Sequence, residues 1–142
     1  MPICVLRIAG EHFAVDEFLR DSSFRPIAIY RKGQARHSTS RRRSNTSGLN
    51  LEVGETADDI AAQSAEAVRF IRANRAELAR ARTYPGVERL VLDFATSFRD
   101  VIVQTERFSA ELVAEAASAG MEIEISIYPV ADVRAAQSVS ED

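Results

Sequence analysis

The feature that most constrains this fold is one long segment, residues 56–82, which contains neither glycine nor proline. Its main apolar residues recur at spacings of seven, four and seven, which places them on one face of a helix. These residues are Ile60, Ala67, Ile71 and Leu78. The pattern predicts one uninterrupted helix, from Thr56 to Arg82, that packs its apolar face on a β-sheet.

Both ends of this predicted helix carry boundary signals. Thr56 and Asp59 form a capping-box-like pair in which each side chain accepts from an exposed backbone N–H. Tyr84-Pro85-Gly86 ends the helix. Asn74 lies close to the apolar face, where it either makes a local hydrogen bond or marks a hydrated patch. Several arginines fall on the opposite, exposed face: Arg69, Arg72 and Arg80.

The rest of the chain alternates short apolar runs with turn residues, which predicts strands and shorter helices. Helices are predicted from Phe13 to Asp21 and from Ser109, a good N-cap, to Gly120. The predicted strands are residues 3–9, 26–30, 49–53, 87–94, 101–105 and 123–127. The fold class is therefore α+β (mixed α/β), with one mixed sheet of about five to six strands covered by three helices, the longest being Thr56–Arg82.

The two ends of the chain resemble each other in their order of elements. A strand at residues 4–9, a helix and the strand Ile27-Ala28-Ile29-Tyr30 parallel a strand at residues 101–105, a helix and Ile125-Ser126-Ile127-Tyr128. This similarity is either a two-fold strand-helix-strand pseudo-repeat or a chance recurrence of the Ile-x-Ile-Tyr pattern. In the last strand, Ile123, Ile125 and Ile127 alternate with polar residues and predict a half-buried strand.

Composition indicates an ordinary globular domain. The chain has 142 residues, of which 46% are hydrophobic and 27% charged, so residues 1–130 are predicted to form a single domain and residues 131–142 a polar tail. The single cysteine, Cys4, excludes an internal disulfide and fits a reducing compartment. No apolar run reaches the length of a membrane span. We therefore expect a cytoplasmic protein that does not interact with membranes.

Positive charge is concentrated in one part of the chain. Residues 25–43 contain seven basic residues and no acidic one, so removing them from the net charge of −3 leaves −10 for the rest. Residues 32–48 contain only one apolar side chain, Ala35, and are predicted to form a mobile loop. The residues that could contact a partner or a phosphate are Arg31, Lys32, Arg36, Arg41, Arg42 and Arg43.

Three interpretations of this basic loop stay open. It could be a solvated insertion, since runs of like charge are often only solvated. It could dock an acidic protein partner by electrostatic steering. It could also bind the phosphates of RNA or DNA, although Tyr30 is its only aromatic neighbour and base stacking is therefore not favoured.

Signals of catalysis are sparse. His12 and His37 lie at no metal-ligand spacing from each other or from Cys4. The sequence contains no Gly-rich phosphate loop and no nucleophile elbow. We therefore predict no catalytic residues, no metal and no cofactor. An unrecognised enzyme would need Tyr30, Arg31, His12 and a carboxylate to converge in one deep pocket.

The C-terminal residues resemble the closing segment of an uncharacterised bacterial domain family, known only as a domain of unknown function. The resemblance rests on the helix that begins at Phe108-Ser109-Ala110-Glu111 and on the strand Ile123 to Pro129, with Leu6 to Gly10 similar to the family's first half. The family supplies no catalytic residues. Small proteins of this kind look like immunity or accessory proteins encoded beside toxins, which implies a binding role.

These observations together predict a non-catalytic protein-binding protein of immunity or accessory type, with an acidic protein as its partner. The alternatives are nucleic-acid binding through the Arg-rich loop and an unrecognised enzyme. The sequence leaves the oligomeric state open.

Overall fold

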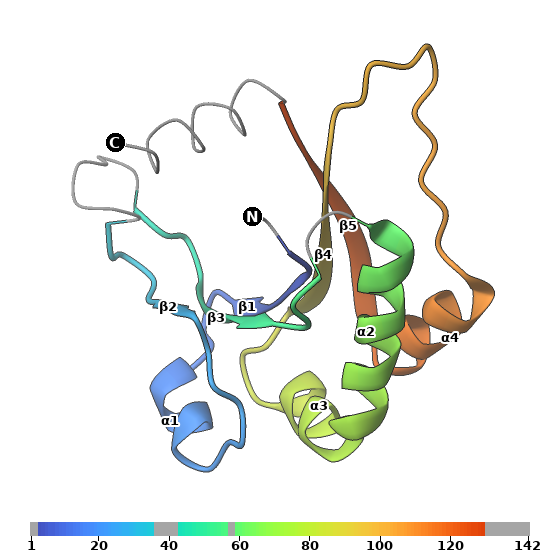
Figure 1. Ribbon diagram of the computed structural model, residues 1–142. Helices are drawn as coiled ribbons and strands as arrows, with labels where there is room; N and C mark the ends of the chain where they lie inside the picture. The colour runs from blue at the N-terminus through green and yellow to red at the C-terminus, as the bar shows by residue number, and fades with distance from the viewer. Residues whose placement is uncertain (1–2, 36–42, 57–58, 130–142) are drawn as a thin grey trace.

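The fold is α+β, as predicted, with one five-stranded mixed sheet in the order β2-β3-β1-β4-β5 (Figure 1). The computed structural model describes residues 3–35, 43–56 and 59–129. The strands are β1 (Val5–Gly10), β2 (Ala28–Tyr30), β3 (Ser47–Glu52), β4 (Arg89–Ser97) and β5 (Met121–Tyr128). The helices are α1 (Val15–Arg20), α2 (Ile60–Ala73), α3 (Arg75–Thr83) and α4 (Ala110–Ser118).

The pairing register brings the apolar side chains of successive strands onto one face of the sheet. Leu6 of β1 pairs with Leu51 of β3 on one side and with Leu92 of β4 on the other, and Leu92 in turn pairs with Ile123 of β5. The helices cover this face (Figure 1), and their buried residues join those of the strands in one core. β1 runs antiparallel to β3 and β4, whereas β4 and β5 are parallel and are joined through α4.

The prediction of one uninterrupted helix from Thr56 to Arg82 is wrong in its continuity, because α2 and α3 are separate helices that meet at Asn74. Asn74 donates a side-chain hydrogen bond to the carbonyl oxygen of Phe70 at 2.9 Å. Its φ of −120° and ψ of 24° are not helical. The local hydrogen bond expected of Asn74 is thus confirmed, and it lets the chain leave the α2 axis. All four residues of the predicted apolar face are buried.

The beginning of α2 also differs from the prediction. Asp59 is the N-cap, and its side chain accepts from the backbone N–H of Ala61 at 2.8 Å and of Ala62 at 3.4 Å. Thr56 takes no part in this cap, because its backbone N–H donates to the carboxylate of Glu66 at 3.0 Å. A side chain inside the helix therefore anchors the segment that precedes it, and the helix begins at Ile60.

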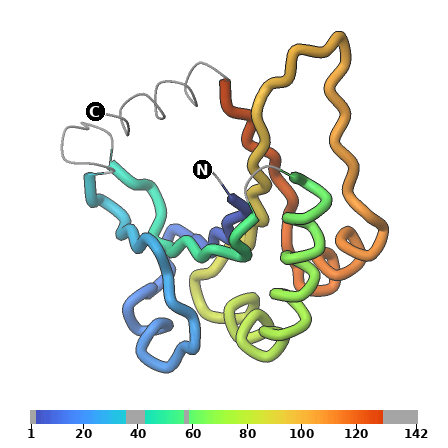
Figure 2. Tube along the Cα trace, viewed as in Figure 1, coloured from blue at the N-terminus to red at the C-terminus, as the bar shows by residue number. Residues whose placement is uncertain are grey.

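The predicted strand at residues 101–105 is absent, and with it the pseudo-repeat in the form proposed. These residues belong to a connection between β4 and α4 that extends well beyond the end of β4 (Figure 2). The apolar run Val101, Ile102 and Val103 was a misleading signal here, because these side chains are exposed rather than packed in the sheet. The unit at the C-terminal end is β4-α4-β5, whereas β1 and β2 are separated by β3.

The C-terminal helix and strand form where the sequence predicts them. The Ser109 side chain accepts from the backbone N–H of Leu112 at 3.1 Å, and Gly120, with a φ of 72°, ends α4 in a conformation that favours glycine. The prediction that β5 has one buried face is wrong for its second half, since Ile125 and Ile127 are exposed.

The predicted domain limits are covered only in part. Residues 131–142 of the predicted tail lie outside the described residues, as do residues 36–42 of the loop predicted at 32–48. The described parts of that loop contain an isolated bridge between Ala35 and Arg43, and β3 already begins at Ser47. Within the described ranges, none of the helices has the length and apolar character that crossing a membrane requires.

Candidate functional site

The residues predicted to form a basic contact surface are not all free cations. The Arg31 guanidinium donates two hydrogen bonds to the Asp16 carboxylate, at 2.8 and 2.7 Å, which lowers the pKa of Asp16. The Lys32 ammonium donates to Glu11 at 2.8 Å and lowers the pKa of that carboxyl. Arg43 donates to the backbone carbonyl of Gly33 at 3.0 Å. Arg36, Arg41 and Arg42 lie outside the described residues, so their predicted role stays a prediction.

The side chains named for an unrecognised enzyme, namely Tyr30, Arg31 and His12, do not line one common cavity. Tyr30 lines a cavity of about 520 Å³ together with Arg7 and Asn50, and neither Arg31 nor His12 contributes to that lining. Arg31 is paired with Asp16, and among the described residues the carboxylate oxygen closest to His12 is that of its neighbour Glu11 at 4.0 Å. In the described part of the chain, no group of three or more His, Cys, Asp and Glu side chains could hold a metal ion.

Cys4 is buried in the core rather than exposed as a nucleophile. Burial raises the pKa of its thiol to about 12, and the negative charge of Asp93 acts in the same direction. The free energy of unfolding is therefore unaffected by this thiol below its unfolded-state pKa, about 8.5. Above that pH the free energy of unfolding falls as the pH rises toward the folded-state pKa.

We predict that Cys4 resists a thiol reagent in mildly alkaline solution, because both burial and the raised pKa withhold the thiolate. The labelling rate should equal the rate at which the protein opens or unfolds, and denaturant should release one reactive thiol. Mass spectrometry of the labelled protein measures this rate. Labelling of the native protein as fast as that of a small free thiol would contradict the buried placement.

Among the described residues, the outer edge of β5 is one of the two open edges of the sheet. β5 is the last strand on its side of the sheet. The carbonyl of Tyr128 points inward, toward the chain of β4, since it accepts from the backbone N–H of Phe98 at 3.1 Å. Because backbone groups alternate in direction along a strand, the N–H and C=O groups of the odd-numbered residues point outward. These residues are Met121, Ile123, Ile125 and Ile127.

Exposed apolar side chains lie beside this open edge. Ile125 is 37% and Ile127 49% exposed. A helix rises less per residue than a strand, so the nine-residue α4 is shorter end to end than the eight-residue β5 and covers only its first part. The connection that follows β4 adds four exposed apolar residues, namely Phe98, Val101, Ile102 and Val103. An open strand edge with exposed aliphatic side chains is a template for pairing with another chain.

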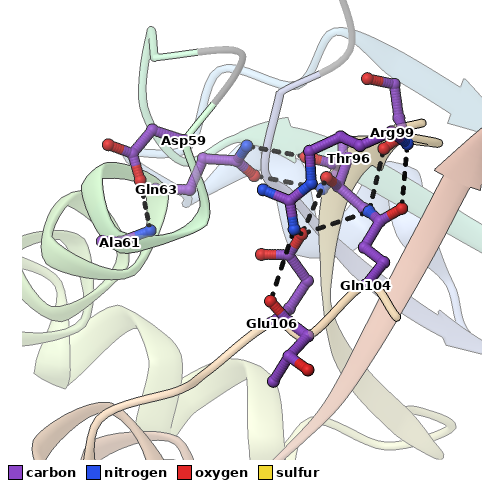
Figure 3. Close-up of polar contacts among 10 residues, drawn as sticks. Asp59, Ala61, Gln63, Thr96, Arg99, Gln104 and Glu106 are labelled. Atoms are coloured by element: carbon purple, nitrogen blue, oxygen red, sulfur yellow. Dashed lines mark hydrogen bonds and ion pairs between the residues drawn. The ribbon is translucent and has the colours of Figure 1, made fainter. Parts of the chain in front are cut away.

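A polar network holds the connection after β4 in place (Figure 3). Arg99 donates to Glu106 at 2.9 Å, and its backbone N–H donates to the side chain of Gln104 at 3.1 Å. Gln104 also donates to the carbonyl of Ser97 at 2.9 Å, and Thr96 donates to Glu106 at 3.3 Å. These contacts fix residues 98–103 at the end of β4, next to β5.

Sequence reasoning missed the β5 surface. The alternation of Ile123, Ile125 and Ile127 was correctly taken as a strand with one apolar face, but the alternation contains no information on what covers that face. The lengths of the two elements explain the exposure, since a helix rises about 1.5 Å and a strand about 3.3 Å per residue, so the nine-residue α4 is too short to cover the eight-residue β5. The sequence did not show this mismatch, because the strand predicted at residues 123–127 has only five residues.

Comparisons of the chain with protein-family models, with curated proteins and with solved structures found no match. The resemblance to a bacterial domain family therefore stays a prediction.

Proposed function

We propose that this chain is a non-catalytic protein-binding protein, and that its principal binding surface is the outer edge of β5. The observation that carries the proposal is an eight-residue edge strand with outward-facing backbone groups and exposed isoleucines. Addition of a strand to such an edge is a common mode of polypeptide recognition, in which backbone hydrogen bonds supply affinity and alternate side chains supply specificity. The cytoplasmic location expected from the single cysteine belongs to the same proposal.

The occupant we propose for this edge is β5 of a second copy of the chain. In an antiparallel pair centred on Ile125, the outward-facing residue Ile123 of one copy lies opposite Ile127 of the other, and Ile125 lies opposite itself. On the other face Glu124 lies opposite Ser126, so no like charges meet directly. This register joins two five-stranded sheets into one and places six isoleucines along the seam.

The neighbouring registers are less favourable. A shift of the centre to Glu124 would set that carboxylate opposite its own copy. A shift to Ser126 would place Pro129, which has no N–H, opposite Ile123 and would remove a hydrogen bond. The acidic side chains of β5 are themselves held by arginines, Glu122 by Arg89 at 3.0 Å and Glu124 by Arg7 at 3.5 Å, which lowers the charge that the seam must accommodate.

We predict that the wild-type protein is a dimer and that Ile125→Lys makes it a monomer. A charged side chain on an edge strand opposes pairing with another edge, and we expect the dimer dissociation constant to rise at least about 100-fold, roughly 3 kcal/mol. Size-exclusion chromatography with light scattering measures the mass over a series of concentrations.

Val113→Lys is the matched control, because Val113 is also apolar and 49% exposed but lies on α4. It should leave the dimer intact. A wild-type protein that stays monomeric at every concentration, or an Ile125→Lys variant that dimerises as wild type does, would rule out the proposed occupant.

The acidic partner predicted for the basic loop remains a separate part of the proposal. Arg31 forms an ion pair with Asp16, and Lys32 forms one with Glu11. The positive charge available to such a partner would therefore come mainly from the remaining arginines of the loop. A dimer joined through β5 would carry one such loop next to each distant sheet edge, because β2 and β5 are the two end strands of the sheet.

A further inference from the structure

The groove between α2 and the beginning of α4 contains an unusual accumulation of positive charge. A cavity of about 500 Å³ lies there, and among the described residues its lining includes the arginines Arg69, Arg72 and Arg107 but only one carboxylate, Glu111. Cavities that bind small molecules commonly have volumes of this order. The lining therefore carries three positive charges against one negative charge.

Within the part of the chain that the structure describes, two of these arginines have no carboxylate partner. Among the described residues, no ion pair within 4.0 Å involves Arg69 or Arg107, whereas Arg72 is paired with Glu111 at 2.7 Å and with Glu115 at 3.2 Å. The carboxylate of Glu66 interacts weakly with the charge of Arg69, but hydrogen bonds from Thr56 and Glu55 are its main contacts. The guanidinium groups of Arg69 and Arg107 are thus available to a ligand.

The first turn of α4 borders the same cavity, since Ser109 and Glu111 line it. Ser109, its N-cap, lines the cavity and uses its hydroxyl to accept from the N–H of Leu112. The N–H groups of Ala110 and Glu111 have no acceptor within the helix, as is general for a first turn, and among the described residues no other group accepts from them. The positive end of the helix dipole adds to their attraction for an anion.

Ser64 also lies in the wall of this cavity and is only 5% exposed. Among the described residues its hydroxyl oxygen has no hydrogen-bond partner, but this oxygen is shielded from solvent and does not face the open cavity. The groups that a ligand can reach are therefore the two arginines and the first turn of α4.

We propose that this cavity binds the phosphate group of a small phosphate monoester. Arg69 and Arg107 would bind the phosphate oxygens from two sides, and the N–H groups of Ala110 and Glu111 would complete the set. Arginine suits this role because its planar guanidinium can donate two parallel hydrogen bonds to one phosphate. Val68 and Ala65 form an apolar wall that suits the organic part of the ester.

The probes that test this site are inorganic phosphate and phenyl phosphate, titrated into the purified protein at low ionic strength and followed by calorimetry and by amide chemical shifts. We expect saturable binding, with shifts at Ala110, Glu111 and Ser64. Arg107→Gln and Arg69→Gln should each weaken binding at least about tenfold, while their spectra stay those of a folded protein. Arg20→Gln, an exposed arginine on α1, should bind as wild type does.

Benzoate distinguishes a phosphate site from a general carboxylate site. Equal binding of benzoate and phenyl phosphate would overturn the proposed ligand class, and unsaturable binding of both, or wild-type affinity in Arg107→Gln, would overturn the site. The Ile125→Lys variant should bind phenyl phosphate normally, so the outcome does not depend on whether the chain dimerises through β5.

Discussion

Replacing Gln63 with leucine is expected to destabilise the protein by about 3 kcal/mol, because it leaves two buried backbone groups of β4 unpaired, each of which costs roughly 1 to 3 kcal/mol. Pairing between β1 and β4 ends at Val5 and Asp93, so Ala95 has no strand beside it on that side. Gln63 of α2 takes the place of the missing strand. Its side chain donates to the carbonyl of Ala95 at 2.8 Å and accepts from its N–H at 3.1 Å.

The shift of the urea unfolding midpoint measures this effect. Ala65→Leu is the matched control, since Ala65 is exposed on the same helix and should change stability by less than about 0.5 kcal/mol. Because Gln63 holds the part of β4 that leads into residues 98–103, we also expect the amide signals of Thr96 and Phe98 to shift. A Gln63→Leu protein as stable as the Ala65→Leu protein would show that the two hydrogen bonds do not matter.

Phe18→Ala is expected to cost about 4 kcal/mol, the largest effect of any single change proposed for this protein. Phe18 is fully buried, and its ring lies 5.6 Å from that of Phe13 and 5.1 Å from that of Tyr84. The Arg80 guanidinium lies 4.1 Å from the ring centroid and donates to the Phe18 carbonyl at 2.7 Å. The ring therefore joins α1 to the end of α3, and alanine would leave a cavity there.

Phe98→Ala provides the control for this prediction, because it removes the same atoms from a ring that is 54% exposed. We expect it to cost less than about 0.5 kcal/mol. Urea unfolding of the two variants side by side gives the difference, and equal destabilisation would contradict the assignment of Phe18 to the core.

The sequence contained enough information for the elements whose boundaries depend on local chemistry. The helix from Ser109 to Gly120 formed as predicted because its cap and its terminating glycine are local signals. The break at Asn74 was harder to predict, since a side chain that competes for the Phe70 carbonyl can either stay within a helix or end it. The contacts that α3 makes with α1, such as that of Arg80 with Phe18, cannot be seen in a sequence pattern.

The candidate site depended on information that is not local. Whether Ile125 is buried depends on the position of β5 in the strand order and on how much of β5 is covered by α4. Both are properties of the folded sheet and its helix, not of a local sequence pattern. Arg69 and Arg72 of α2 were correctly predicted to be exposed, but Arg107 comes from a segment far away in sequence and was not predicted to lie near them. Only the folded chain brings Arg69 and Arg107 to one cavity.

Formation of a disulfide by an Ile125→Cys variant tests the central claim most directly. In the proposed register residue 125 lies opposite itself, at a Cα separation of about 5.5 Å, which a disulfide can span. Buried Cys4 should not interfere. We predict rapid formation of a cross-linked dimer under mild oxidation, whereas Val113→Cys should stay largely monomeric. An Ile125→Cys protein that cross-links no faster than Val113→Cys would contradict the claim that β5 pairs with β5.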